Sequence, residues 1–322
     1  MFAGNPLDRG ERERRDDNWL EARAKDPESR FLPLWQLNVP ILDGAEPALG
    51  WVQAEVLNGI AVKADPNFLG LLDGVAHFAI DVSELEDPGR ELGVDGSLKF
   101  EEARTAATLL APAEAGILAQ ARSQVDWHAR HRFCGVCGAL SRQERGGQMR
   151  RCPDCDAQHF PRTDPVVIVV VSSGDRCILG QSRGRLSQMK MYSALAGFVD
   201  QGESIEEAVR REVMEEAGIV VGDVRYHSSQ PWPFPSSLMI GCHAGALSTQ
   251  IRPDDVEMAD VRWFDRRDVL RALAGENEEL NVPGEIAIAH HLIKAWATGE
   301  AQETQEASLF FPTAAAGPPT LD

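Results

Sequence analysis

Three glutamates in the second half of the chain, Glu212, Glu215 and Glu216, stand at positions i, i+3 and i+4. In an α-helix this spacing places their carboxylates on one face, where like charges repel by roughly a few tenths of a kcal/mol per pair. One interpretation is a solvated acidic face, which is common in acidic proteins. The other is a divalent-cation site, because carboxylate oxygens favour Mg²⁺ or Mn²⁺. Taken alone, the three residues favour the solvated face.

Four of the six cysteines form two CxxC pairs separated by fourteen residues. Four thiolates that converge at about 2.3 Å from an ion make a closed tetrahedral zinc site, and two facing turns supply that geometry. A dithiol redox pair is the alternative, but a second pair at this spacing favours zinc. We therefore expect one structural Zn²⁺ per chain, without an open position for catalysis, held by Cys134, Cys137, Cys152 and Cys155.

A third segment alternates proline with aromatic residues and reads Gln-Pro-Trp-Pro-Phe-Pro-Ser-Ser over 230–237. Proline has no backbone N–H, so this segment cannot pair fully as a central strand and forms a stiff, extended loop. Such a loop would hold Trp232 and Phe234 in fixed orientations. Taken alone, the motif is more consistent with a rigid loop that braces the core than with a binding site.

The elements that position these residues are readable from the sequence. Ser204 and Glu207 have the spacing of a capping box, which predicts a helix over 204–217 that packs through Ile205, Ala208, Val209 and Val213. Strands are expected at 165–171, 177–183 and 193–199 and in the runs YHSSQPW, SLMIGCHAGAL and DVRWF, with helices at 265–273 and 286–296. Cys177 and Cys242 fall in such strands as small apolar residues.

The composition limits the possible classes. The chain has 322 residues with 32 Lys+Arg and 50 Asp+Glu, a formal net charge of −18. This charge disfavours nonspecific binding of long polyanions. The absence of a long apolar run excludes a membrane span, and the polar first residues favour a cytoplasmic protein. The first fifteen or so residues are expected to form a loose arm, and the residues beyond Thr298 a disordered tail.

The flanks of the glutamates change their interpretation. From Gly197 to Ile219 the sequence fits G-x5-E-x7-R-E-U-x-E-E-x-G-U at all nine fixed positions, where U is a bulky aliphatic residue. The segment resembles the signature of the Nudix hydrolases, which cleave a nucleoside diphosphate linked to another group. The resemblance implies an α/β/α sandwich, with Mg²⁺ or Mn²⁺ as the catalytic metal. We therefore expect an α+β protein in which this sandwich follows a zinc ribbon and an N-terminal α+β domain.

The resemblance also assigns roles. It implies a metal site and catalytic group formed by Glu212, Glu215 and Glu216, with the backbone carbonyl of Ala196 and, before a Trp-Phe pair, Glu257 as further metal ligands. Glu203 and Arg211 are expected to form an ion pair that fastens the loop to the helix. Gly197 and Gly218 are expected at turns where a Cβ would obstruct.

A Nudix signature followed by SQPWPFPxS and preceded by a four-cysteine ribbon resembles the NADH pyrophosphatase subfamily. The sequences RFCGVCG, HFPRTDP and FEEAR are similar to further marks of that subfamily. The resemblance implies hydrolysis of NAD(H) to NMN(H) and AMP, with removal of NAD caps from RNA 5′ ends as a further activity, by a homodimer. It implies substrate contacts by Arg104, Phe160, Ala289 and the residues Gln230, Pro231, Trp232, Pro233, Phe234, Pro235, Ser236 and Ser237. Phe160 stands where many members have tyrosine, which removes one hydroxyl but keeps a stacking ring.

Two other functions remain open at this point. The chain could be a Nudix hydrolase of ADP-ribose or another dinucleotide, with the proline motif only structural. From a different class, it could be a zinc-ribbon nucleic-acid-binding protein whose Nudix domain is not catalytic, since residues 130–162 carry seven arginines and three acidic residues. The intact glutamates and the acidic charge speak against this class. The expected division is 1–125 N-terminal α+β domain for packing, dimerisation or pocket framing, 126–162 zinc ribbon, 163–298 Nudix domain and 299–322 tail.

Overall fold

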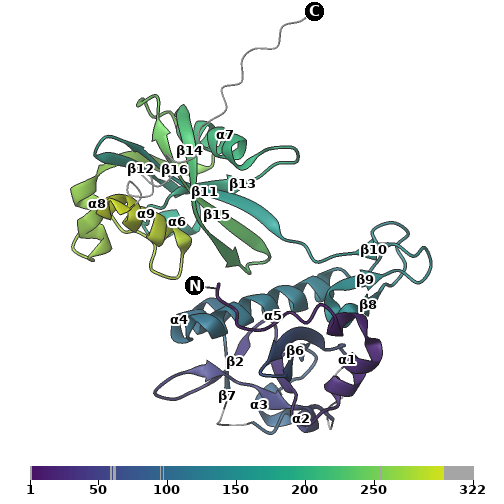
Figure 1. Cartoon of the computed structure of the whole chain (residues 1–322). Coiled ribbons are helices and arrows are strands. Elements are labelled where there is room, and N and C mark those ends of the chain that lie inside the picture. Colours follow the sequence, from purple (N-terminus) through teal and green to yellow (C-terminus); the bar gives the residue numbers. More distant parts are fainter. Residues whose placement is uncertain are drawn as a thin grey trace, which may run out of the picture. The chain divides into compact units, whose positions relative to one another are not determined.

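The computed structural model describes residues 2–300 except 59, 61–62, 95, 97 and 254–255. The chain divides into two compact units (Figure 1). The first unit contains residues 2–165 and 230–239, and the second contains 166–229 and the residues from 240 onward. The tail expected to be disordered lies, over 301–322, outside the described residues, and the finer division of the sequence into four parts stays a prediction.

The N-terminal part of the first unit is built on two small sheets and several helices. One sheet has the strand order β4-β1-β6-β5 and the other β3-β2-β7. The strands are β1 (Arg30–Leu34), β2 (Val39–Leu42), β3 (Ala48–Leu49), β4 (Val52–Gln53), β5 (Asn67–Leu72), β6 (Val75–Asp81) and β7 (Leu98–Glu101). The helices are η1 (Glu13–Arg15), α1 (Asp17–Ala24), α2 (Ala54–Asn58), α3 (Pro88–Glu91), α4 (Ala103–Leu109) and α5 (Pro112–Arg130). The expected α+β character of this part is therefore confirmed.

The core of this part is aromatic. The rings of Phe31 and Phe78 stack at 5.0 Å between centroids, on β1 and β6. The long helix α5 buries a face that includes Leu118 and Val125. Glu102 accepts hydrogen bonds from the backbone of Arg104 and Thr105 and so begins α4.

The prediction of a loose arm over the first fifteen residues is wrong. Phe2 and Leu7 are buried, and Asp8 forms a β-bridge with Leu71. Arg14 is 2% exposed, and its guanidinium donates to the carbonyls of Arg9 and Leu69. Those carbonyls satisfy the charged group inside the protein. The sequence of the arm did not predict its order, because the partners Leu69 and Leu71 lie far along the chain.

The ribbon completes the first unit. It is a three-stranded antiparallel sheet of β8 (Arg142–Glu144), β9 (Met149–Arg151) and β10 (Gln158–His159), with η2 (Arg145–Gly147) between the first two. It packs on the N-terminal part through a buried network. His128 on α5 accepts from Arg150 and contacts the carbonyl oxygen of Gly147 at 2.9 Å.

The second unit contains a six-stranded sheet of order β14-β15-β11-β12-β16, with β13 paired to β11. Its strands are β11 (Asp164–Ser173), β12 (Arg176–Ser182), β13 (Leu195–Phe198), β14 (Val221–Trp232), β15 (Ser237–Ala246) and β16 (Met258–Asp265). Every strand expected from the sequence of this region is present. The motif of 230–237 ends an edge strand and begins the next one, because its prolines stop the ladder where it turns.

In the described part of this unit, four helices accompany the sheet, and all but the short α6 are expected from the sequence. They are α6 (Arg185–Gln188), α7 (Ile205–Ala217), α8 (Arg266–Leu273) and α9 (Ile288–Thr298). Helix α7 buries Val209 and Val213 against the sheet core. On β15, a Cβ at Gly241 would meet Ile288 and Leu292, which shows how closely α9 packs there. Among the described residues, no helix has the length and apolar character needed to cross a membrane.

Candidate active site

The box glutamates lie on α7, whose two ends are fixed by local chemistry. Ser204 accepts a hydrogen bond from the backbone N–H of Glu207, and the Glu207 carboxylate accepts from that of Ser204, so the predicted capping box is present. At the other end Gly218 has a φ of +68°, a left-handed conformation that suits glycine. The helix therefore starts and stops at residues of the signature.

Two of the three box carboxylates are buried. Glu212 and Glu216 are each 8% exposed, whereas Glu215 is exposed. Glu216 accepts a hydrogen bond of 3.2 Å from the backbone N–H of Ala196 on β13. Burial first, then the charge of Glu212, raises the pKa of Glu216 to about 8. Burial also raises the pKa of Glu212. The helix face thus carries two desolvated carboxylates, which a solvated acidic face does not require.

Gly197 is needed for close approach and does not lie at a turn. It lies within β13, and a Cβ placed on it would come within 1.9 Å of the carboxyl carbon of Glu212. The expectation of a turn at Gly197 was therefore wrong, although the obstruction by a Cβ is present. Gly197 leaves the space that the Glu212 carboxylate occupies over the strand.

Arg211 binds several acidic groups at once. Its guanidinium makes two hydrogen bonds to Glu203, at 2.7 and 2.8 Å, and it also contacts Glu212 at 2.9 Å and Glu215 at 3.0 Å. It donates as well to the carbonyl of Phe198. The predicted ion pair is present, and it lowers the pKa of Glu203 to about 2. Arg211 therefore fastens the loop to α7 and partly neutralises the glutamate face.

The carboxylates suit a hard divalent cation by their chemistry, since oxygen donors are what Mg²⁺ and Mn²⁺ prefer. The exposed Glu257, just before β16, is close enough for its charge to raise the pKa of both Glu212 and Glu216. Among the described residues, however, carboxylates do not converge to within 4.8 Å as a group of three. Arg211 supplies the positive charge near Glu212 and Glu215 in the structure.

The four cysteines do converge. Their sulfur atoms lie within 4.8 Å of one another, with 3.7 Å between Cys134 and Cys155 and 3.4 Å between Cys137 and Cys152. These separations fit four thiolates around one tetrahedral ion with bonds of about 2.3 Å. Hydrogen bonds to its sulfur, the first from the Cys137 backbone, lower the pKa of Cys134 to about 6, which favours the thiolate. His159 adds a contact of 3.2 Å to the same sulfur.

The proline–aromatic motif belongs to the first unit. The guanidinium carbon of Arg104 lies 4.3 Å from the ring centroid of Phe234, and that of Arg122 lies 4.7 Å from it. Arg122 also donates to the carbonyl of Pro233. The Nε atoms of both arginines are buried and have no hydrogen-bond partner in the described part of the chain. Both side chains are half-buried, and a buried N–H without a partner on each makes this region attractive to an anion.

The remaining expected substrate residues have distinct environments. Phe160, in the first unit, is 60% exposed and offers a free ring face. Gln230 is 4% exposed and lies at the start of the motif, and Ala289 is buried in α9 of the second unit. Ser236 and Asp164 bond to each other through backbone and side chain.

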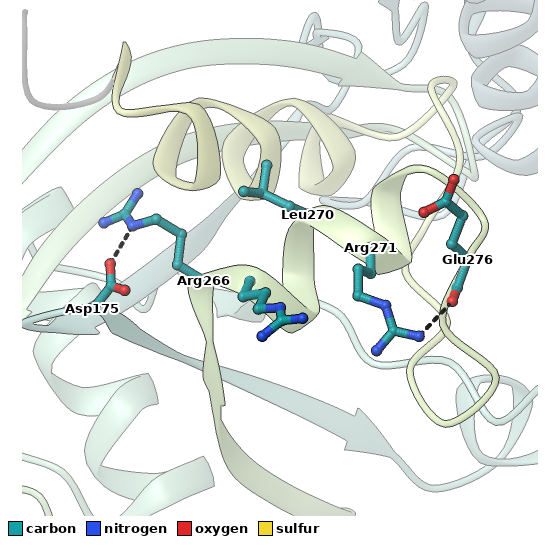
Figure 2. Close-up of a pocket in the computed structure, with 6 residues that line it drawn as sticks. Asp175, Arg266, Leu270, Arg271 and Glu276 are labelled. Atoms are coloured by element: carbon teal, nitrogen blue, oxygen red, sulfur yellow. Dashed lines mark hydrogen bonds and ion pairs between the residues drawn. The ribbon is translucent and has the colours of Figure 1, made fainter.

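A cavity of about 390 Å³ in the second unit does not involve the glutamates. It is lined by Asp175, Arg266, Arg267, Leu270, Arg271 and Glu276. Figure 2 shows Arg266 directed at Asp175, with a separation of 2.5 Å, and Arg271 bonded to the backbone of Glu276. Because these arginines are held by the protein itself, the cavity is a poor candidate for the reaction site.

Sequence reasoning missed three contributors. Arg122 holds the proline motif, Phe2 contacts its rings, and His159 contacts a zinc-ligand sulfur. Arg122 lies on the face of a regular helix, where no local pattern distinguishes it from other arginines. His159 could have been noticed because it lies four residues after Cys155, the last of the four zinc-site cysteines, and one before Phe160.

Three sequence families match the chain. They are the NUDIX domain over residues 161–282, the NADH pyrophosphatase-like rudimentary NUDIX domain over 28–127 and the NADH pyrophosphatase zinc ribbon domain over 129–160. The chain belongs to the Nudix family, in the branch that carries this zinc ribbon.

Individual relatives span most of the chain. The NAD-capped RNA hydrolase NUDT12 of Macaca fascicularis is 39% identical over 338 residues, which cover 92% of this chain and 72% of that protein. The NAD-capped RNA hydrolase of Schizosaccharomyces pombe is 32% identical over 347 residues and covers 92% of each. The human mitochondrial NAD(P)H pyrophosphatase NUDT13 is 37% identical over 257 residues, covering 76% and 72%.

Proposed function

We propose that the protein hydrolyses the pyrophosphate bond of NAD(H), giving NMN(H) and AMP, and that it also removes NAD caps from RNA 5′ ends. The observation that carries this proposal is the pair of buried carboxylates, Glu212 and Glu216, held on a capped helix against β13. The names of the relatives, which are NAD-capped RNA hydrolases and an NAD(P)H pyrophosphatase, support the choice of substrate.

The metal ligands are Glu212, Glu216 and Glu257, with the Ala196 carbonyl and with Glu215 on the same helix face. A bound Mg²⁺ or Mn²⁺ neutralises pyrophosphate charge and lowers the pKa of a bound water. The protein residues prepare this chemistry by holding carboxylates together that would otherwise repel each other. Arg211 keeps Glu212 and Glu215 in place and anchors the loop through Glu203.

In the first unit, the motif of 230–237, Arg104 and Phe160 contact the nucleotide. In the second unit, the family resemblance adds Ala289 as a further substrate contact. Two half-buried arginines near Phe234 favour the negative charge of a dinucleotide, and the ring of Phe160 is free to stack on a base. Neither group acts on the phosphorus; they orient the substrate and contribute affinity. ADP-ribose shares the pyrophosphate and adenosine, so hydrolysis of ADP-ribose is the second candidate.

The ribbon contributes a structural role. One Zn²⁺ held by the four cysteines stabilises the ribbon, which has little core of its own. The surrounding arginines bind the RNA chain that follows an NAD cap. A homodimer and a cytoplasmic location are further parts of the proposal, which rest on the family resemblance and the composition.

The test compares kcat/KM of the full chain on NADH, ADP-ribose and NAD-capped RNA, with Mg²⁺ and with Mn²⁺. The proposal expects NADH and NAD-capped RNA to be preferred over ADP-ribose by at least about tenfold, because the aromatic motif gains contacts from the nicotinamide half. Equal or higher values for ADP-ribose would favour the second candidate. Binding of capped RNA without any product would favour a non-catalytic binding protein.

A further inference from the structure

The N-terminal arm, residues 2–15, reaches the proline–aromatic motif. The side chain of Phe2 is 1% exposed, and its ring packs edge-on against two rings of the motif. The centroid distances are 5.8 Å to Trp232 and 5.7 Å to Phe234. Trp232 and Phe234 are in turn 5.2 Å apart. The arm therefore supplies the third ring of a three-ring cluster within the first unit.

The arm is fixed to the fold at two residues that follow Phe2, Asn5 and Asp8. The Asn5 amide donates to the Gly116 carbonyl at 3.3 Å and to the Gln120 side chain at 2.8 Å. A Cβ at Gly116 would lie 2.7 Å from the Asn5 backbone nitrogen, so the arm lies directly on α5. Asp8 and Leu71 exchange two backbone hydrogen bonds of 2.9 and 2.8 Å. The position of Phe2 is therefore determined by contacts outside the motif.

The backbone at Phe2 indicates that its ring placement is specific. Its φ of +62° lies in the left-handed region, which is unfavourable for a bulky residue other than glycine. Such a conformation persists when surrounding contacts compensate for it. Burial of the ring against Trp232 and Phe234 is a compensating contact that the structure offers.

The motif has other partners, but none that replaces Phe2. Arg104 and Arg122 hold Phe234 through their guanidiniums, and Arg122 also holds the Pro233 carbonyl. Trp232 has the more distant Arg104 at 5.7 Å in addition to the two rings. Without the ring of Phe2, Trp232 would lose a packing partner and gain freedom to rotate.

We propose that Phe2 is a positioning residue for substrate recognition: through the arm it fixes the rings of Trp232 and Phe234 in the orientation that binds the dinucleotide. This inference rests on the proposed function for the identity of the substrate. It predicts that the arm governs KM and leaves the hydrolytic step unchanged, because the two ring contacts of Phe2 are to recognition residues, Trp232 and Phe234.

The first experiment measures steady-state kinetics of the full chain with NADH. Phe2→Ala is expected to raise KM about tenfold and change kcat less than about twofold, because two edge-to-face ring contacts are lost. Phe2→Leu keeps apolar volume and is expected to raise KM about threefold. Arg15→Ala removes an exposed ion pair with Glu11 in the same arm and is the matched control, with unchanged KM. An unchanged KM in folded Phe2→Ala, or a loss confined to kcat, would overturn the proposal.

A second experiment does not depend on activity. Amide hydrogen exchange in peptides that cover 230–239 is compared between the wild-type chain, Phe2→Leu, Phe2→Ala and Arg15→Ala. The proposal expects faster exchange, by about tenfold in Phe2→Ala, in these peptides and in the arm alone. Unchanged exchange in 230–239 would reject the positioning role. If the wild-type chain fails to hydrolyse NADH while this exchange response is present, the proposed function fails and the positioning of the motif stands.

Discussion

At the scale of single residues, the contact between Gly197 and Glu212 links the backbone of β13 to the reaction site. The strand has room for the carboxylate because Gly197 has no side chain. Substitution by a larger residue pushes on the end of a flexible glutamate side chain, which can move without unfolding the domain. The consequence is displacement of one proposed metal ligand, Glu212, with the fold retained.

Gly197→Ala is therefore expected to lower kcat/KM by about 100-fold, the loss typical of a misplaced catalytic group. The melting temperature is expected to change little. Gly245→Ala is the matched control, since Gly245 lies in the same sheet and a Cβ there meets no atom within 4 Å. Both variants are assayed for NADH hydrolysis and for thermal unfolding. Full activity in Gly197→Ala would contradict the role of the Glu212 position.

The sequence predicted which glutamates share a face but not which are buried. The helical spacing determines in which direction each side chain leaves the helix axis. Whether Glu212 and Glu216 are buried depends on β13, a strand outside the helix. The same reason explains the error at Gly197. The signature showed that a side chain was excluded there, and only the structure shows that the excluding group is a carboxylate.

At the scale of elements, α5 is joined to the ribbon by the ring of His128. Because Arg150 can only donate, Nδ1 of His128 accepts from it, and the ring proton lies on Nε2 toward the Gly147 carbonyl. Burial, followed by the charge of Arg150, lowers the pKa of His128 from 6.5 to about 4. A protonated ring would present a second donor to Arg150, so the joint requires neutral histidine.

This joint makes stability depend on pH. His128 is protonated below pH 6.5 in the unfolded chain but only near pH 4 in the folded chain. The contribution of neutral His128 to the free energy of unfolding is therefore complete above pH 6.5 and is lost as the pH falls toward 4. Between pH 7 and 5.5 the loss is about 1 kcal/mol of unfolding free energy. His128→Gln is expected to remove that part of the dependence in urea unfolding, with zinc content followed in parallel. An unfolding free energy with the same pH dependence in His128→Gln as in the wild type would contradict this role of His128.

Elements with local signals were predictable from the sequence, and those with distant partners were not. Helix α7 has its cap, its apolar stripe and its terminal glycine within the signature, so its bounds followed directly. The N-terminal arm has no such signals. Its order comes from Phe2, Asn5 and Asp8 contacting residues that lie far along the chain.

At the scale of the whole molecule, the acidic charge has two local exceptions that fit a negatively charged substrate. The glutamate face is proposed to bind cations, and the first unit holds two half-buried arginines, Arg104 and Arg122, beside the proline–aromatic motif. The net charge of −18 therefore excludes neither a dinucleotide nor a capped RNA end. The composition alone could not show this, because it does not report where charges lie.

The most direct test is product analysis of NADH hydrolysis by the full chain with Mg²⁺ or Mn²⁺. Wild-type protein is expected to release NMNH and AMP in equal amounts, and Glu216→Gln is expected to lose at least about 1,000-fold in kcat while its melting temperature stays close to wild type. Glu206→Gln, an exposed glutamate on the same helix, is the control and should keep wild-type activity. Absence of AMP from the wild-type reaction, or full turnover by Glu216→Gln, would contradict the central claim.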